Sequence, residues 1–323
     1  MCKYFMQIGL CKFLFMFCYM FSNVNFAVSQ SKFEEIVLNT EKTRLYGTLT
    51  LPSLSEPVPL VIIIPGSGPT DRDGNNPSMK TYSLKMLGDS LASRGIASFR
   101  YDKRGIGQSR DTAVKEEDLR YRTYANDAAE WIKLLQTDKR FSKIVIIGHS
   151  EGSMVGMLAA QKAKVNGFVS IAGPGRSADK VLRDQLNPQP KAIRDIAYPI
   201  IDSLVAGKTI KDVHPMLASL FRPSVQPYLI SWFRHDPALE INRLTIPILI
   251  VHGANDLQVP LADAELLQSA NKSAEVVVIE GMNHIMKESE ANLQQNLDTY
   301  YNSKSPIASQ LVKECVEFIR TAE

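Results

Sequence analysis

The sequence predicts an α/β fold, in which a doubly wound, mainly parallel sheet carries helices on both faces and a helical cap insertion. Continuous apolar runs such as Pro59–Pro65 (PLVIIIP) are typical of strands buried on both faces of a parallel sheet. Segments with apolar residues at helical spacing alternate with these runs. The chain has 323 residues, 45% of them apolar, which is enough for one large domain of this class.

The expected elements follow one another from an opening hairpin to a final helix. Glu35–Leu38 and Leu45–Leu51 alternate apolar and polar residues, which predicts the two strands of the hairpin. Buried strands after Pro59–Pro65 are expected at Ile96–Tyr101, Lys143–Gly148, Gly167–Ala172, Pro247–Val251 and Glu275–Ile279. Helices are expected around two apolar sets, Leu84, Leu87 and Leu91, and Tyr124, Ala128, Trp131, Ile132 and Leu135.

The alternation of strands and helices breaks between about residues 174 and 244. This stretch has no long β-branched run, and prolines, which end or kink helices, interrupt its helical patterns. We interpret it as a helical cap insertion between two strands of the sheet. Ligands of open α/β sheets bind beyond the carboxyl ends of the strands, so an insertion at that edge would cover the site. A separate domain without contact to the site is the alternative.

Residues 1–29 have the layout of a secretory signal peptide. A basic start precedes the apolar run Phe13–Phe21, and small residues lie before a cleavage site near Ser29. The run is too short to span a bilayer as a stable helix, and an uncleaved anchor is the alternative. We therefore expect a domain of residues 30–323 that is exported, either periplasmic or secreted, without stable membrane insertion.

Charge and cysteine content exclude several classes of protein. The net charge is only +3, from 37 basic and 34 acidic residues, and the sequence lacks the concentrated basic stripe of a nucleic-acid binder. Of the 4 cysteines, only Cys315 lies outside the expected signal peptide, so the mature chain would form no internal disulfide. Cys315 falls on the apolar face of a final helix, which predicts a buried structural residue rather than a catalytic thiol.

The sharpest chemical signal is Gly148-His149-Ser150-Glu151-Gly152, a G-x-S-x-G motif between a predicted strand and a predicted helix. In this context the motif predicts a sharp turn that projects the Ser150 hydroxyl above the sheet, and the glycines permit that turn without side-chain clashes. Ser150 would also begin a helix, whose free N–H groups favour developing negative charge. The side chain of His149 is expected to point away from the nucleophile.

A serine nucleophile needs a positioned base, and the base needs a carboxylate that orients it. Of the 5 histidines, His284 lies in a short loop after the last predicted strand. Asp256 lies in the loop after the preceding strand. Catalytic groups of this type of sheet lie in such loops, so the chain order Ser150, Asp256, His284 predicts a triad of nucleophile, acid and base.

Two backbone N–H groups are expected to bind the oxyanion of the reaction. One belongs to Glu151, the residue after the nucleophile. The other should come from the glycine-rich loop after the first buried strand, at Ser67, with Gly68 as the alternative. The loop has neither of the glycine motifs that bind nucleotide phosphates, which argues against a nucleotide cofactor.

Two charged loops follow predicted strands near this site. Asp71, Arg72 and Asp73 could support the oxyanion loop or bound the acyl pocket, and a surface turn explains them equally well. Tyr101–Gly107 is expected to fix the turn into the next helix, which is a structural role.

Together these motifs resemble those of the α/β-hydrolase superfamily over essentially the whole mature chain. The motifs are GHSEG at 148–152, D-x-R-G-x-G-x-S at 102–109, HGAND at 252–256 and GMNH at 281–284. More narrowly, PGSGPTDRDGN at 65–75 and AGPGR at 172–176 look like those of bacterial serine esterases with a helical cap. The resemblance implies carboxylic-ester hydrolysis by a Ser150–Asp256–His284 triad with no cofactor and no metal. The sequence departs from the family at Pro65-Gly66, where a His-Gly pair commonly precedes the oxyanion donor.

The expected activity is hydrolysis of small-molecule esters with small to medium acyl groups through an acyl-enzyme. Apolar cap residues would form the acyl pocket, namely Leu182, Leu186, Ile193, Leu220 and Phe221. A peptidase with the same triad is the closest alternative, and it would need a site for a peptide amine or carboxylate. A thioesterase is disfavoured by the export signal, and a catalytically silent binding protein by the intact triad.

Overall fold

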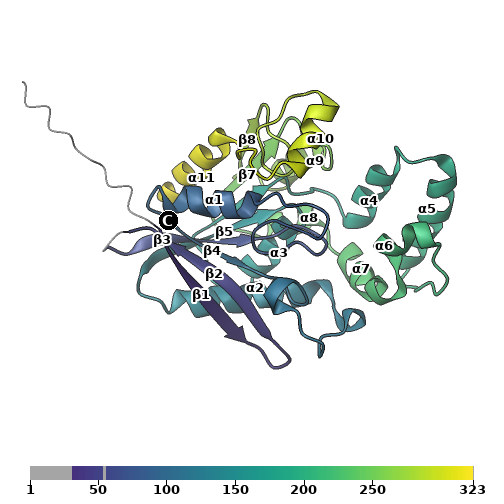
Figure 1. Cartoon of the computed structure of the whole chain (residues 1–323), viewed down its shortest axis with the longest axis horizontal. Helices are drawn as coiled ribbons and strands as arrows, with labels where there is room; N and C mark the ends of the chain where they lie inside the picture. Colours follow the sequence, from purple (N-terminus) through teal and green to yellow (C-terminus); the bar gives the residue numbers. More distant parts are fainter. Residues whose placement is uncertain (1–30, 54–55, 323) are drawn as a thin grey trace, which may run out of the picture.

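The computed structural model describes residues 31–53 and 56–322 (Figure 1). The expected signal peptide lies outside this range. Among the helices of the described residues, none combines the length and the apolar character that a membrane crossing requires.

In the described residues, an eight-stranded sheet has the order β1-β2-β4-β3-β5-β6-β7-β8. β1 pairs with β2 and β2 with β4 in antiparallel fashion, and every other pair of neighbours is parallel. The strands are β1 (Lys32–Asn39), β2 (Arg44–Leu51), β3 (Val58–Ile64), β4 (Ala97–Tyr101), β5 (Phe141–His149), β6 (Gly167–Ile171), β7 (Ile248–Gly253) and β8 (Glu275–Ile279). Each expected strand is present, and the mainly parallel α/β fold is confirmed.

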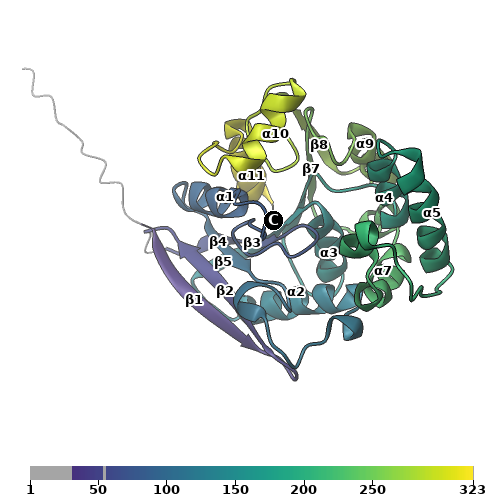
Figure 2. The ribbon, with the colours of Figure 1, turned by 45° about the vertical axis from the view of Figure 1, so that its right-hand side comes forward.

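Strand β3 is covered by apolar cores on both faces of the sheet, which explains why its sequence has no polar residue. Leu60, Ile62 and Ile64 pack into the apolar core on one face of the sheet, and Val61 and Ile63 pack into the core on the other. Helices α1 and α11 contribute to the second core, and α2, α3 and α9 contribute to the first, on the opposite face (Figures 1 and 2). The helices that flank the sheet are α1 (Ser83–Ala92), α2 (Tyr121–Gln136), α3 (Glu151–Ala160), α9 (Leu261–Ala270), α10 (Leu293–Tyr301) and α11 (Ser309–Thr321).

Between β6 and β7 the chain forms helices that lie to one side of the sheet, except for the last of them, which lies against it (Figure 1). These are α4 (Ala178–Leu186), α5 (Lys191–Val205), α6 (Ala218–Phe221), α7 (Gln226–Phe233) and α8 (Pro237–Asn242). Helices α4–α7 share an apolar core of their own, which includes Leu204 and Phe221, whereas Ile241 of α8 packs into the main core. We refer to α4–α7, residues 178–233, as the helical segment.

Cys315 is completely buried in α11, at the position where the sequence predicted a structural residue. Burial raises the pKa of its thiol to about 12. A thiol with this pKa stays protonated at neutral pH and is a poor nucleophile, so Cys315 acts as a small apolar side chain of the core.

Candidate active site

The turn between β5 and α3 holds Ser150 in a backbone conformation that few residues adopt. Its φ is 54° and its ψ is −121°. The chain can bend this sharply because the residues two positions before and after Ser150 lack side chains. A Cβ on Gly148 would lie 2.3 Å from the carbonyl oxygen of Gly152. A Cβ on Gly152 would in turn lie 2.3 Å from the carbonyl oxygen of Ile64. The two glycines therefore let the turn pack directly against the end of β3.

Ser150, His284 and Asp256 form a continuous hydrogen-bonded chain. The Oγ of Ser150 lies 3.1 Å from Nε2 of His284, and Nδ1 of His284 lies 2.8 Å from Oδ2 of Asp256. In the neutral histidine this geometry has Ser150 donating to Nε2 and Nδ1–H donating to the carboxylate. The three residues predicted from chain order thus come together, although they are up to 134 positions apart in the sequence.

The environment of Asp256 favours its ionised form. Burial alone would raise the pKa of this carboxyl, but the neighbouring His284 and the N–H groups of Val259 and Gln258 hold the pKa below its ordinary value. Those N–H groups donate to Oδ1 at 2.9 and 2.7 Å, which leaves Oδ2 for the histidine. An ionised Asp256 can orient His284 and stabilise the positive charge that His284 acquires when it takes a proton.

His149 links the nucleophile turn to the loop that carries His284. Its Nε2–H donates to the carbonyl oxygen of His284 at 2.7 Å, and the two imidazole rings lie 5.1 Å apart. Burial and the neighbouring His284 lower the pKa of His149 to about 4, so it is neutral at pH 7. The sequence analysis expected this side chain to point away from the nucleophile. Its hydrogen bond goes to the His284 backbone rather than to Ser150.

The glycine-rich loop after β3 lies against the nucleophile. A Cβ on Gly66 would lie 3.3 Å from the Cβ of Ser150. Ser67, Gly68 and Glu151 line the same cavity as Ser150. Within the described residues, the N–H groups of Ser67 and Glu151 donate to no other backbone atom. The residues of both predicted oxyanion donors therefore lie in the wall of the cavity beside Ser150.

The cavity above Ser150 has a volume of about 640 Å³ and lies between the sheet and the helical segment. Its walls are mainly apolar and include Leu182 and Leu220 from the predicted acyl pocket, together with Leu229, Trp232 and Val259. A volume of this size suits a small organic ligand.

Four residues predicted for the substrate pocket do not line this cavity. One of them, Ile193 of α5, is partly buried and packs against the core of the helical segment. Leu186 and Phe221 are buried in the core of the helical segment, because they lie on the faces of α4 and α6 that pack against the other helices. Asp71 instead shapes its own loop, since its Oδ1 accepts the N–H groups of Asp73 and Asn75 at 2.9 and 2.8 Å.

The cavity also contains a buried polar cluster that the sequence analysis missed. Lys103 and the Glu151 side chain face each other across 3.7 Å, and the hydroxyl of Tyr228 in α7 donates to Glu151. Burial lowers the pKa of Lys103, although Glu151 opposes the shift. Three charged residues directly after a buried strand, DKR at 102–104, are the signal that could have found it.

The neighbours of Lys103 have the structural role that the sequence predicted for this turn. Arg72 forms a buried ion pair with Asp102 at 2.7 Å, and Arg104 forms one with Asp127 at 2.6 Å. These carboxylates receive two guanidinium hydrogen bonds each, so the pairs hold the turn and the loop after β3 in place.

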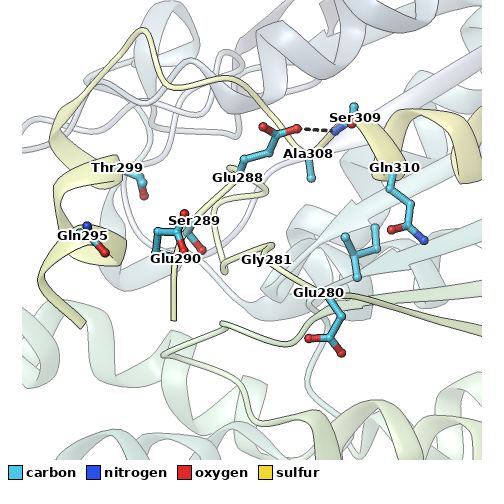
Figure 3. Close-up of a pocket in the computed structure, with 11 residues that line it drawn as sticks. Glu280, Gly281, Glu288, Ser289, Glu290, Gln295, Thr299, Ala308, Ser309 and Gln310 are labelled. Atoms are coloured by element: carbon cyan, nitrogen blue, oxygen red, sulfur yellow. Dashed lines mark hydrogen bonds between the residues drawn. The ribbon is translucent and has the colours of Figure 1, made fainter. Parts of the chain in front are cut away.

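A second cavity, of about 570 Å³, lies near β8, α10 and α11 (Figure 3). Glu280, Glu288 and Glu290 line it, and Glu288 accepts the N–H of Ser309 at 3.2 Å. Among the described residues, no three histidine, cysteine or acidic side chains are grouped closely enough to hold a metal ion.

Comparison with curated proteins gives one relative with a described activity. Esterase EstD of Thermotoga maritima is 28% identical over 290 residues, which is 85% of this chain. The chain spans 65% of the length of that relative.

Solved structures share the fold at low sequence identity. Est1E from Butyrivibrio proteoclasticus, solved with ferulic acid bound, has a TM-score of 0.60 and 18% identity over 88% of this chain and 100% of its own. The α/β-hydrolase GrgF from Penicillium sp. sh18 has a TM-score of 0.59 and 18% identity over 90% of this chain and 99% of its own. Both likenesses place the chain in the α/β-hydrolase fold.

The family model described as serine aminopeptidase, S33 matches residues 74–238. This range covers about half of the chain and includes Ser150, and it ends before Asp256 and His284. The fold, the nucleophile turn and this match agree, and the chain belongs to the Hydrolase_4 family of α/β-hydrolases.

Proposed function

We propose that the protein is a serine esterase that hydrolyses small-molecule carboxylic esters through an acyl-enzyme. The observation that carries the proposal is the hydrogen-bonded chain from Ser150 through His284 to Asp256, beside a largely apolar cavity. Similarity to Esterase EstD, over the 65% of that protein that the chain spans, supports ester substrates. Est1E and GrgF support the fold alone.

In the proposed reaction, Ser150 Oγ attacks the ester carbonyl while Nε2 of His284 accepts the hydroxyl proton. Asp256 keeps the His284 ring oriented and stabilises the imidazolium. The N–H groups of Ser67 and Glu151 bind the oxyanion of the tetrahedral intermediate. His284 then gives the proton to the leaving alcohol, and it activates the water that releases the acid from Ser150.

The helical segment would act as a cap that forms the acyl pocket. Leu182 and Leu220 come from this segment and line the cavity opposite Ser150. Their apolar surface favours acyl chains, because burying each methylene group contributes roughly 0.8 kcal/mol. The cavity volume of about 640 Å³ limits these chains to small or medium size.

An aminopeptidase needs a carboxylate that is free to bind the α-amino group of its substrate. The two carboxylates that line the cavity are both engaged. Glu116 accepts hydrogen bonds from Arg222 and Ser224, and Glu151 is held by Tyr228 and Lys103. This pairing supports the esterase over the peptidase.

We propose further that residues 1–29 direct export and are removed, so that the mature enzyme is periplasmic or secreted. The mass of the protein recovered outside the cytoplasm tests this directly. A mature form that begins near Gln30 is expected, and retention of residues 1–29 would contradict the proposal.

The function is tested by p-nitrophenyl ester hydrolysis with acetate, butyrate, octanoate and palmitate, alongside aminoacyl p-nitroanilides. We expect turnover of the shorter esters and a loss on the order of 10⁶-fold in kcat for Ser150→Ala. Asp256→Asn should lose about 10⁴-fold, because the asparagine favours the wrong histidine tautomer. Ester turnover that survives in Ser150→Ala, or turnover of the amides alone, would refute the esterase assignment.

A further inference from the structure

Lys103 places a buried ammonium group at the loop that carries the predicted oxyanion donor. The residue is 3% exposed and is the second residue after β4. Its Nζ donates to the carbonyl oxygen of Gly66 at 2.5 Å and lies 5.4 Å from the ring centre of Tyr124. Taking an ammonium group out of water is costly unless its partners are close, so this position is defined by specific contacts.

The carbonyl that Lys103 binds belongs to the same peptide unit as the Ser67 N–H. None of the peptide bonds in the described residues is cis, so the C=O of Gly66 and the N–H of Ser67 point in opposite directions. A donor that holds the oxygen fixes the plane of the peptide and therefore the direction of the N–H. A hydrogen bond to the carbonyl also polarises the amide, which strengthens the N–H as a donor.

Glu151 keeps Lys103 in this position. Its Oε2 lies 3.7 Å from Nζ, and its other oxygen accepts a hydrogen bond from Tyr228. The same residue provides the second predicted oxyanion donor through its backbone N–H. The Lys103 ammonium thus lies between the two segments that would bind the oxyanion.

We propose that Lys103 is a positioning residue for the oxyanion hole, which orients and polarises the Gly66–Ser67 peptide so that the Ser67 N–H can stabilise the transition state. The proposal rests on the serine-hydrolase function proposed above. Lys103 does not contact the reacting atoms, and its effect passes through the Gly66 carbonyl.

The test compares Lys103→Met with wild type, using kcat and KM on an ester that wild type hydrolyses. Losing an oxyanion donor outright costs roughly 10²- to 10³-fold in kcat. Lys103 acts on such a donor indirectly, so we expect a fall of about 10- to 100-fold in kcat with KM changed less than about threefold. The rate at which a fluorophosphonate labels Ser150, followed by mass spectrometry, should fall by a similar factor, because the phosphoryl oxygen occupies the same hole.

Lys103→Met leaves the Glu151 carboxylate buried without its positive partner. The double variant Lys103→Met/Glu151→Gln removes both charges and so avoids this unpaired carboxylate. The double variant should remain slow, since the Gly66 carbonyl still lacks its donor. Glu151→Gln alone leaves Lys103 present but removes the carboxylate that holds it, so its fall in kcat should be smaller than that of Lys103→Met. Recovery of kcat in the double variant would overturn the proposal, because it would assign the loss to the uncompensated carboxylate.

Lys287→Met is the matched control, since Lys287 is also buried and its Nζ also donates to a backbone carbonyl, that of Ser305. It should keep kcat within about threefold. A folded Lys103→Met with wild-type labelling of Ser150 would overturn the proposal even if no ester is a substrate. Wild type that is inert to every ester but is labelled at Ser150 would refute the esterase activity alone.

Discussion

Lowering the pH should destabilise the protein through His149, by an amount that the structure allows us to calculate. Burial and the nearby His284 lower the pKa of His149 to about 4, against 6.5 for an exposed imidazole. Between these two pH values the unfolded chain binds a proton that the folded protein does not. Stability therefore falls as the pH drops below about 6.5, and the loss ends near pH 4, where the folded protein also takes up the proton.

The difference between 6.5 and about 4 corresponds to roughly 3 kcal/mol, at about 1.4 kcal/mol per pH unit. About 2.5 kcal/mol of this should be lost by pH 4.5. Urea unfolding of wild type and His149→Gln, at pH 7 and at pH 4.5, measures it. The glutamine cannot titrate but can still donate to the His284 carbonyl, and the contributions of the carboxylates cancel in the comparison.

Between pH 7 and pH 4.5, the free energy of unfolding of wild type should therefore fall by about 2.5 kcal/mol more than that of His149→Gln. If the difference in the free energy of unfolding between wild type and His149→Gln is the same at both pH values, within about 0.5 kcal/mol, the reasoning is refuted. It would mean that the imidazole is protonated in the folded protein at pH 4.5, and so that His149 is far more accessible to water than its 8% exposure indicates.

Two further predictions concern packing. Phe221→Ala should lower the free energy of unfolding by about 3–5 kcal/mol in urea titrations, because Phe221 is 0% exposed in the core of the helical segment. Leu220 is 39% exposed and lies in the cavity wall, so Leu220→Ala should lower the free energy of unfolding by under about 1 kcal/mol and should instead alter the preference for acyl length. Equal losses of stability in Phe221→Ala and Leu220→Ala would contradict this assignment. Gly148→Ala should lower stability by roughly 3 kcal/mol and impair ester turnover, because the new Cβ would meet the Gly152 carbonyl oxygen at 2.3 Å. Wild-type stability and turnover in Gly148→Ala would show that the turn can relax.

The sheet and the approach of Ser150, Asp256 and His284 could be predicted, because buried strands have a local sequence pattern and parallel pairing brings their carboxyl ends to one edge. A run such as PLVIIIP at 59–65 would place apolar side chains in water if either face of its strand were exposed. Its alternate residues do pack into two different cores. The loops after β7 and β8 leave the same edge of the sheet as Ser150, so parallel pairing alone brings their side chains together.

The lining of the cavity could not be predicted in the same way. Leu182 and Leu186 are one helical turn apart in α4, yet Leu182 lines the cavity and Leu186 belongs to the core of the segment. Leu220 and Phe221 are adjacent in α6, and here too the first lines the cavity while the second belongs to the core of the segment. An apolar residue in a short helix can serve either surface, and only the packing of α4–α7 on one another decides which.

Strain at the nucleophile is compensated by close packing around it. A positive φ at Ser150 costs on the order of 1–3 kcal/mol, and it persists only where the surroundings leave no alternative. Here the Ser150 N–H donates to the carbonyl oxygen of Ile171 at the end of β6, while Gly152 packs against the end of β3. The turn is thereby attached to both neighbours of β5 in the sheet. Substitutions at these contacts should therefore reduce activity before they reduce the content of secondary structure, because they release Ser150 while the two cores remain intact.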